Sequence, residues 1–209
     1  MDIKYHDIGF PFIEIQNTYD DNELELIWEE LNFLCYSDKL KGPEETGAAF
    51  EFDQFGNKYH TKNNRGILID TVYSERTTSN ILTCNRKLFN IVSKAFLETD
   101  HWFYKRMKIT EDYTLLSYYE NNQYYGIHND NSIITALTWF YKEPKKFEGG
   151  DLGFSDFNYI IPVKNNYTIL FPGIINHFVT SVTMDEKNLN KKYGRFCMSQ
   201  FLYNRRLQS

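Results

Sequence analysis

The chain of 209 residues has few cysteines, and their placement argues against a disulfide framework. There are three of them, Cys35, Cys84 and Cys197. An odd number of widely separated cysteines with no CxxC pair is typical of reduced thiols inside a cell. No run of about 18 apolar residues is present, so we expect no membrane span. The N-terminal residues MDIKYHDIGF lack the basic and apolar segments of a signal peptide, and we expect a cytoplasmic protein.

Basic residues are also scarce. The chain has 23 Lys and Arg against 28 Asp and Glu, a formal net charge of -5. Duplex nucleic acid binds surfaces with an excess of Lys and Arg. We therefore expect no duplex nucleic acid partner, and a peptide or small molecule is the favoured substrate. The oligomeric state is left open.

Aromatic residues are abundant instead. Hydrophobic residues make up 42% of the chain and aromatics 17%, including 16 Tyr and 17 Phe. This supply can build a large core without disulfides or a structural metal ion. There is no internal repeat and no Pro-, Ser- or Gly-rich linker, so we expect a single domain over residues 1–209.

The first region of that domain, residues 1–100, has a mixed pattern. Residues 10–16 look extended, and Asp20 and its neighbours can cap a first helix. Residues 48–72 predict two strands joined by a polar loop, and a second helix starts near Ser79. The apolar residues expected on the buried helix faces are Leu24, Ile27, Trp28, Leu31 and Leu34 in the first helix and Ile81, Leu88, Ile91, Val92 and Ala95 in the second.

The second region, residues 101–205, alternates short runs rich in Tyr, Phe, Ile, Val and Thr with turn residues. About eight short strands at this spacing predict a β-sandwich or barrel. Helices followed by strands predict a mainly β (α+β) fold in which N-terminal helices pack outside a jelly roll.

A candidate metal site begins with His128-Asn129-Asp130, an HxD pattern. In a strand, residues i and i+2 face the same side, so both side chains can reach one ion. His177, which follows a turn 49 residues beyond His128, is the candidate third ligand. Two imidazoles and one carboxylate leave three open positions on an octahedral metal, which suits O2 chemistry at Fe(II). The remaining histidines, His6, His60 and His101, are assigned to ordinary surface or core positions.

Arg195 lies in the otherwise apolar run GRFCMSQFLY, residues 194–203. Strand alternation places Arg195, Cys197, Ser199 and Phe201 on one face. An unpaired guanidinium in an apolar interior is costly, so a carboxylate of the protein or of a ligand must meet it. A guanidinium can bind a carboxylate through two parallel hydrogen bonds. Both partners remain open at this point.

Four ordered segments together resemble the prolyl 4-hydroxylase-like branch of the 2-oxoglutarate/Fe(II)-dependent dioxygenases. Residues 119–130 (YENNQYYGIHND) resemble its YxxGxxYxxHxD signature, with Asn122 in place of the Gly. Residues 148–154 (EGGDLGF) resemble its EGGELxF segment, and residues 169–182 resemble its LxFPxxxxHxVxPV segment. Residues 194–196 (GRF) match the start of its last core strand.

This resemblance implies a double-stranded β-helix (a cupin-like jelly roll) with iron at its open mouth, held by His128, Asp130 and His177. It implies Fe(II), 2-oxoglutarate as cosubstrate and O2, with ascorbate as an optional reductant. The implied reaction hydroxylates an amino-acid-like substrate, with peptidyl proline as one candidate, and releases succinate and CO2.

The resemblance also assigns residues to the cosubstrate. Arg195 would bind the distal carboxylate of 2-oxoglutarate, with a hydroxyl from Tyr119. Many relatives have Ser where this chain has Cys197, so that hydrogen bond falls to Ser199 or is absent. Tyr125 would lie near cosubstrate and substrate, but plain alternation puts it opposite His128, so this role needs a bulge near Gly126.

Several departures and alternatives remain. Arg195 lies 18 positions after His177, farther than in most relatives, and the intervening polar residues predict a long hairpin loop. Trp139 fits core packing better than a pocket wall. Phe201, where an Arg would stand, disfavours the nucleic-acid dealkylating branch. The alternatives are a non-catalytic jelly-roll module that binds a ligand or partner, and a dioxygenase acting on a small molecule or nucleobase. Residues 52–64 and 183–194 are the candidate lid loops.

Overall fold

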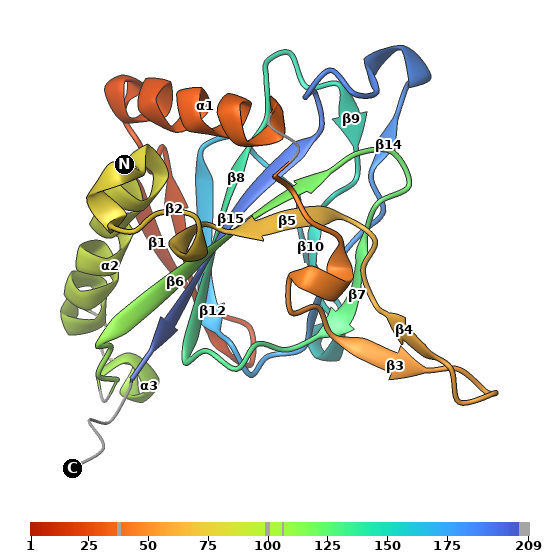
Figure 1. The fold of residues 1–209 in the computed structure, drawn as a ribbon. Coiled ribbons are helices and arrows are strands. Elements are labelled where there is room, and N and C mark those ends of the chain that lie inside the picture. The colour runs from red at the N-terminus through yellow and green to blue at the C-terminus, as the bar shows by residue number, and fades with distance from the viewer. Residues whose placement is uncertain (37–38, 99–100, 106, 205–209) are drawn as a thin grey trace.

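The computed structural model describes residues 1–36, 39–98, 101–105 and 107–204. The fold is mainly β with flanking helices, as the sequence predicts (Figure 1). Val92 and Ala95 were expected on the buried face of the second helix, but their side chains lie outside the described part of the chain.

The strands form two main antiparallel sheets. The larger has the order β1-β2-β12-β8-β15-β6-β5, and the smaller has the order β11-β10-β13-β7. Strands of the first 100 residues therefore share a sheet with those of the second region. Bounds in the larger sheet are β1 (Asp2–Asp7), β2 (Pro11–Gln16), β12 (Tyr167–Pro172), β8 (Ile134–Phe140), β15 (Arg195–Tyr203), β6 (Glu111–Tyr119) and β5 (Arg65–Leu68). Those in the smaller sheet are β11 (Tyr159–Ile161), β10 (Leu152–Phe154), β13 (His177–Val179) and β7 (Tyr125–His128).

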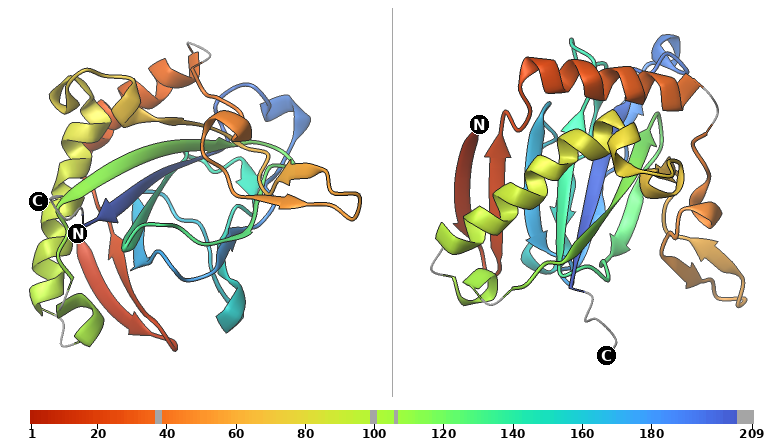
Figure 2. Two further views of the ribbon diagram at one scale, coloured as in Figure 1. Left: turned by 60° about the horizontal axis from the view of Figure 1, so that its bottom comes forward. Right: turned by 60° about the vertical axis from the view of Figure 1, so that its left-hand side comes forward.

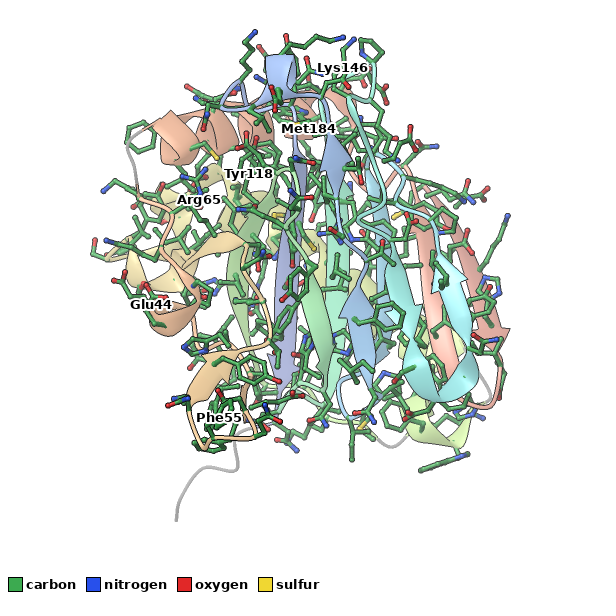
Figure 3. All side chains as sticks on the ribbon, turned by 90° about the vertical axis from the view of Figure 1, so that its right-hand side faces the viewer. Glu44, Phe55, Arg65, Tyr118, Lys146 and Met184 are labelled. Carbon is green, nitrogen blue, oxygen red and sulfur yellow. The ribbon has the colours of Figure 1, made fainter. Side chains whose placement is uncertain are left out.

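Two short antiparallel pairs complete the β structure: β14 (Thr183–Met184) with β9 (Phe147–Glu148), and the hairpin of β3 (Phe50–Phe52) with β4 (Lys58–His60). The β3–β4 hairpin projects from the body of the molecule (Figure 1). Figure 3 shows Phe55 at its tip, where the side chain is 79% exposed. Residues 48–72 thus hold three strands, β3, β4 and β5, rather than the two expected.

The helices lie on the outer face of the larger sheet (Figure 2). They are α1 (Asp21–Tyr36), α2 (Asn80–Glu98) and α3 (Trp102–Lys105), with single 3-10 turns η1 (Pro43–Glu45), η2 (Ile69–Thr71), η3 (Arg76–Thr78), η4 (Ser155–Phe157) and η5 (Glu186–Asn188). None of the described helices is long and apolar enough to cross a bilayer.

Local capping explains where the two long helices begin. The Glu23 amide donates to Asp20 Oδ1 (3.0 Å) while the Asp20 amide donates to Glu23 Oε2 (2.9 Å), which is a reciprocal capping box. At α2, Ser79 Oγ accepts from the Leu82 amide (3.0 Å). Both starting points agree with the sequence prediction.

Strand β15 separates two hydrophobic cores. Phe196, Met198 and Leu202 face outward and pack with apolar residues of α1 and α2. Cys197 faces inward, into the core that includes Trp139 and Phe171 between the two sheets. Because successive side chains of a strand point to opposite faces, the helices hold β15 in place from the side opposite the interior of the barrel.

A buried carboxylate connects the two long helices. Glu30 of α1 is 6% exposed and accepts hydrogen bonds from three donors. Its donors are the Ser79 hydroxyl (2.8 and 3.0 Å), the Ile81 amide (2.7 Å) and the Tyr73 hydroxyl (2.6 Å). Glu30 thereby adds a negative charge at the N-terminus of α2, where the helix dipole favours it.

We expect Glu30→Ala to lower the free energy of unfolding by about 3 kcal/mol, because it leaves buried donors without an acceptor. For a chain of this length the melting temperature should fall by roughly 6–12 °C. Thermal unfolding followed by circular dichroism measures this. Glu25→Ala, on the exposed side of α1, is the control and should change little. Equal shifts in the two variants would show that the Glu30 network does not stabilise the fold.

Candidate metal centre

Two histidines meet across the smaller sheet. His128 ends β7 and His177 begins β13, and the two residues are paired in register. Their ring centroids are 4.1 Å apart. Each ring is packed by an aromatic neighbour, Tyr125 stacked on His128 at 3.5 Å and Phe171 edge-on to His177 at 4.8 Å. The strand pairing therefore brings together residues that are 49 positions apart in the chain.

Backbone carbonyls set the tautomer of both imidazoles. His128 Nδ1 lies 2.8 Å from the Gly126 carbonyl and His177 Nδ1 lies 2.9 Å from the Ile175 carbonyl. A carbonyl oxygen only accepts, so each Nδ1 must carry the hydrogen. Both Nε2 atoms are then free to bind a metal ion, which is the usual arrangement for a metal-ligating histidine.

Asp130 faces both Nε2 atoms. Its Oδ2 is 3.6 Å from His177 Nε2 and its Oδ1 is 4.0 Å from His128 Nε2. The three ligand atoms lie within 4.8 Å of one another, and within the described residues this is the one cluster of His, Cys, Asp or Glu side chains with such spacing. The structure thus brings the three predicted residues together.

The route by which Asp130 reaches the site differs from the expectation. Strand β7 ends at His128, so Asp130 lies in the following loop and not on the same strand face. Its amide donates to the Gly173 carbonyl (2.8 Å), and Thr135 of β8 donates its hydroxyl to Asp130 Oδ2 (2.5 Å). Ser132 and Thr135 hydroxyls are 2.8 Å apart, which extends the chain of hydrogen bonds. Contacts with neighbouring segments therefore orient the carboxylate.

Burial controls the protonation of the cluster. Burial, together with the adjacent His177, lowers the pKa of His128 to about 3, so this imidazole is neutral at physiological pH. Burial raises the pKa of Asp130, and His177, Thr135 and Lys62 offset this rise only in part. A cation at the centre would stabilise the buried carboxylate further.

A cavity of about 670 Å³ adjoins the cluster and follows the inner face of β15. Alternate residues of that strand line it: Arg195, Cys197, Ser199, Phe201 and Tyr203. The first three are buried and the last two are half-buried. The closed end of the cavity is therefore at Arg195 and its mouth is near Tyr203. The predicted division of β15 into two faces is correct.

Arg195 has no exposed surface, and none of its three guanidinium nitrogens has a hydrogen-bond partner among the described residues. Its guanidinium lies 4.7 Å from the centre of the Tyr119 ring and 5.7 Å from that of Trp139. Gly150, with φ +73°, leaves the space for it, since a Cβ there would lie 2.7 Å from Arg195 Cδ. Of the two partners that the sequence left open, a protein carboxylate is not found in the described part of the chain.

Tyr125 and Ser199, the other predicted cosubstrate residues, also line the cavity. The β7–β13 register shifts between His177 and Val179, so Tyr125 and His128 stack although they are three positions apart. This is the irregularity that the sequence required near Gly126. The Tyr125 hydroxyl accepts from the Ala49 amide (3.1 Å), and burial raises its pKa. Ser199 Oγ lies 3.8 Å from Cys197 Sγ.

Other sequence expectations have mixed outcomes. Asn122 adopts φ 62°, a left-handed conformation that Asn tolerates, so it can occupy the position of the expected Gly. Trp139 is fully buried in the inner core.

The two candidate lid loops differ in their relation to the cavity. All of residues 183–194 are described, and none of them lines the cavity. Phe50 and Lys62, at either end of the β3–β4 hairpin, do line it.

The sequence reasoning missed two side chains, Thr135 and Lys62. Thr135 touches Asp130, and Lys62 lines the cavity beside Tyr125. No spacing rule connects either residue to the HxD pattern. The only sequence signal is a polar residue in each segment, and most such residues are structural.

Comparison with known proteins supports the fold. No protein-family model and no curated protein matches the sequence. Solved structures do match. A Pseudomonas putida prolyl-4-hydroxylase is 13% identical, with 95% of each chain covered and a TM-score of 0.60. The viral collagen prolyl hydroxylase of Paramecium bursaria Chlorella virus-1, in its 2OG complex, is 11% identical, with 91% of this chain and 94% of that chain covered and a TM-score of 0.52.

A Burkholderia pseudomallei oxidoreductase of the 2OG-Fe(II) oxygenase family is also similar. It is 12% identical, with 92% of this chain and 84% of that chain covered and a TM-score of 0.53. At these identities the comparison establishes the fold. The chain has the jelly-roll fold of the 2-oxoglutarate/Fe(II) oxygenases, as the sequence resemblance implied.

We expect Thr135→Val to weaken Mn(II) binding by about 10-fold or more, because it removes the hydroxyl that orients Asp130. Calorimetric titration with Mn(II), a redox-stable stand-in for Fe(II), measures the dissociation constant. Thr138→Val is the matched control, since Thr138 is buried on the same strand and bonds Thr168 (2.7 Å) instead. If the two variants bind Mn(II) equally well, Thr135 is not a positioning residue.

Proposed function

We propose that this protein is an Fe(II)- and 2-oxoglutarate-dependent oxygenase that hydroxylates an amino-acid-like substrate, with peptidyl proline as the first candidate. His128, Asp130 and His177 would be the metal ligands. Arg195 would bind the distal carboxylate of 2-oxoglutarate, with Tyr119 and Ser199 beside it and Tyr125 between cosubstrate and substrate.

The observation that carries this proposal is the unpartnered guanidinium of Arg195 at the closed end of the cavity. A buried cation without a counter-charge is strongly disfavoured unless a ligand supplies one. The cavity leads from Arg195 to the His128–Asp130–His177 cluster. A dicarboxylate can therefore pair with Arg195 at one end and reach the metal site with the other.

The donor set fits Fe(II). Two neutral imidazoles and one carboxylate are the ligands of non-haem iron sites that keep positions open for cosubstrate and O2. Fe(II) and 2-oxoglutarate, when bound here, would supply O2 activation, with one oxygen atom for the substrate hydroxyl and the other for succinate, and with release of CO2. Nothing in the described residues points to a site for ascorbate.

The residues of this chain then have separate tasks. The hydrogen bonds from Nδ1 of both histidines hold their Nε2 atoms toward the metal position. Thr135 holds the Asp130 carboxylate, and Arg195 fixes the register of the cosubstrate. The inner core around Trp139 and Phe171 keeps water from the closed end of the cavity. Together these contacts preorganise the site before any ligand enters.

The first test is succinate formation. Protein loaded with Fe(II) under O2 should convert 2-oxoglutarate to succinate, slowly alone and faster with its substrate in a panel of proline-containing peptides, free amino acids and nucleotides. His128→Ala and Asp130→Ala should reduce succinate formation to background. His60→Ala, a histidine that does not line the cavity, is the control and should retain activity. Iron-loaded wild type that never consumes 2-oxoglutarate would overturn the proposal.

The second test separates cosubstrate from metal binding. Arg195→Met should weaken 2-oxoglutarate binding by about 100-fold, since a buried charge pair is lost. Its affinity for Mn(II) should be unchanged, because Arg195 is not a ligand. Arg65→Met, outside this cavity, is the control. Calorimetry gives both constants. Unchanged 2-oxoglutarate affinity in Arg195→Met would contradict the assignment, and a wild type without Mn(II) or Fe(II) affinity would favour a non-catalytic binding module.

A further inference from the structure

A second buried cation lines the cavity. Lys62 lies just beyond β4 and forms a β-bridge with Tyr125, next to the metal cluster. The neighbouring Thr61 carbonyl accepts from the Gly126 amide (2.7 Å), which fixes this segment against β7. Lys62 is 3% exposed, and its ammonium lies 5.1 Å from the centre of the Tyr125 ring. The lysine side chain is therefore held inside the cavity and not in bulk solvent.

The charge of Lys62 is not balanced within the site. In the described part of the chain, the lysines that form ion pairs are Lys41, Lys87 and Lys187, and Lys62 is not among them. Asp130 is the acidic group whose field reaches it, but Asp130 would be a metal ligand. Glu45, the other acidic residue on the cavity wall, has a side chain that is 55% exposed and lies 3.9 Å from the Lys41 ammonium. Neither carboxylate is a dedicated partner for Lys62.

The positive charge of Lys62 would also be unbalanced with a metal ion and 2-oxoglutarate bound. A divalent metal ion, the Asp130 carboxylate, the 2-oxoglutarate dianion and the Arg195 guanidinium cancel one another in formal charge. The ammonium of Lys62 is then the remaining charge on the inner wall. Without a bound ion, burial lowers the pKa of the Lys62 ammonium to about 8. One positive charge in a partly desolvated cavity favours one compensating negative charge.

We propose that Lys62 binds a carboxylate of the primary substrate and so selects an amino-acid-like substrate with a carboxylate near the reacting carbon. This inference rests on the proposed function and extends it to the substrate. A single ammonium matches a monoanion, whereas a phosphate dianion would leave the site negative. Arg195 is committed to the cosubstrate, and among the described residues Lys62 is the other cation that lines the cavity.

The experiment uses full-length protein loaded with Mn(II) and 2-oxoglutarate without O2, so that binding is measured without turnover. The probes are two matched pairs. N-acetyl-L-proline and N-acetyl-L-prolinamide differ in a terminal carboxylate. The α-amides of N-acetyl-L-glutamate and N-acetyl-L-glutamine differ in a side-chain carboxylate. Paramagnetic relaxation of the probe protons by Mn(II) reports both the affinity and the proximity to the metal.

We expect at least one carboxylate probe to bind wild type about 10-fold more tightly than its amide. Lys62→Gln should abolish this preference and Lys62→Arg should retain part of it, because only the charge is kept. Lys58→Gln, a lysine on β4 that does not line the cavity, should behave as wild type. The affinity for 2-oxoglutarate should be the same in all four proteins, and Lys62→Gln should bind Mn(II) at least as tightly as wild type, because a positive charge near Asp130 is removed.

Three results would overturn the inference. Equal binding within both pairs, including no detectable binding of either member, would show that the site does not select a carboxylate. Weaker 2-oxoglutarate binding in Lys62→Gln would place Lys62 on the cosubstrate. Inorganic phosphate that binds more tightly than the carboxylates, and only when Lys62 is present, would indicate a phosphate ester. In each case Mn(II) and 2-oxoglutarate still bind wild type, whereas loss of that binding would refute the proposed function itself.

Discussion

The site depends on one cation that the protein buries and leaves without a counter-charge. The Arg195 guanidinium lies between the Tyr119 and Trp139 rings, in space that Gly150 leaves open. Ring faces attract a guanidinium weakly and do not replace a carboxylate. The positive charge of Arg195 therefore remains available to attract an anionic ligand. Under the proposed function, a carboxylate that pairs with Arg195 would lie at a fixed depth relative to His128, Asp130 and His177.

Strand β15 connects the helices to this site, because it packs against them on one face and lines the cavity on the other. Its outer residues, such as Phe196 and Met198, pack in the core formed with α1 and α2, and its inner residues line the cavity. The Glu30 network in turn fixes α2 against α1. None of the described residues of α1, α2 and α3 lines the cavity, yet these helices pack on the outer face of β15 and so hold its inner face in place. Packing on the outer face of β15 thus fixes the positions of the cavity-lining side chains on its inner face.

Local signals in the sequence predicted local features well. The sequence placed a cap at Asp20 and a second helix start near Ser79, where the structure has the hydrogen bonds that begin both helices, and alternation in β15 assigned its two faces. Strand β1 was missed because it is a short edge strand with little burial and only two apolar residues, Ile3 and Tyr5. Asp130 was expected to share a strand face with His128, but β7 ends before it. Lys62 meets Tyr125 through a contact between distant segments, which no spacing along the chain encodes. Thr135 lies only five positions from Asp130, but their hydrogen bond depends on how the intervening loop folds.

The pairing of β15 has a consequence for how such proteins are recognised. Arg195 is opposite Tyr119 on β6, and His177 is opposite His128 on β7. The loop between His177 and Arg195 can vary in length without disturbing either pair, since register is fixed by the ladders and not by the connection. A search that counts positions from the second histidine would overlook this arginine. A search for the residue paired with Tyr119, at the end of the strand before β7, would find it.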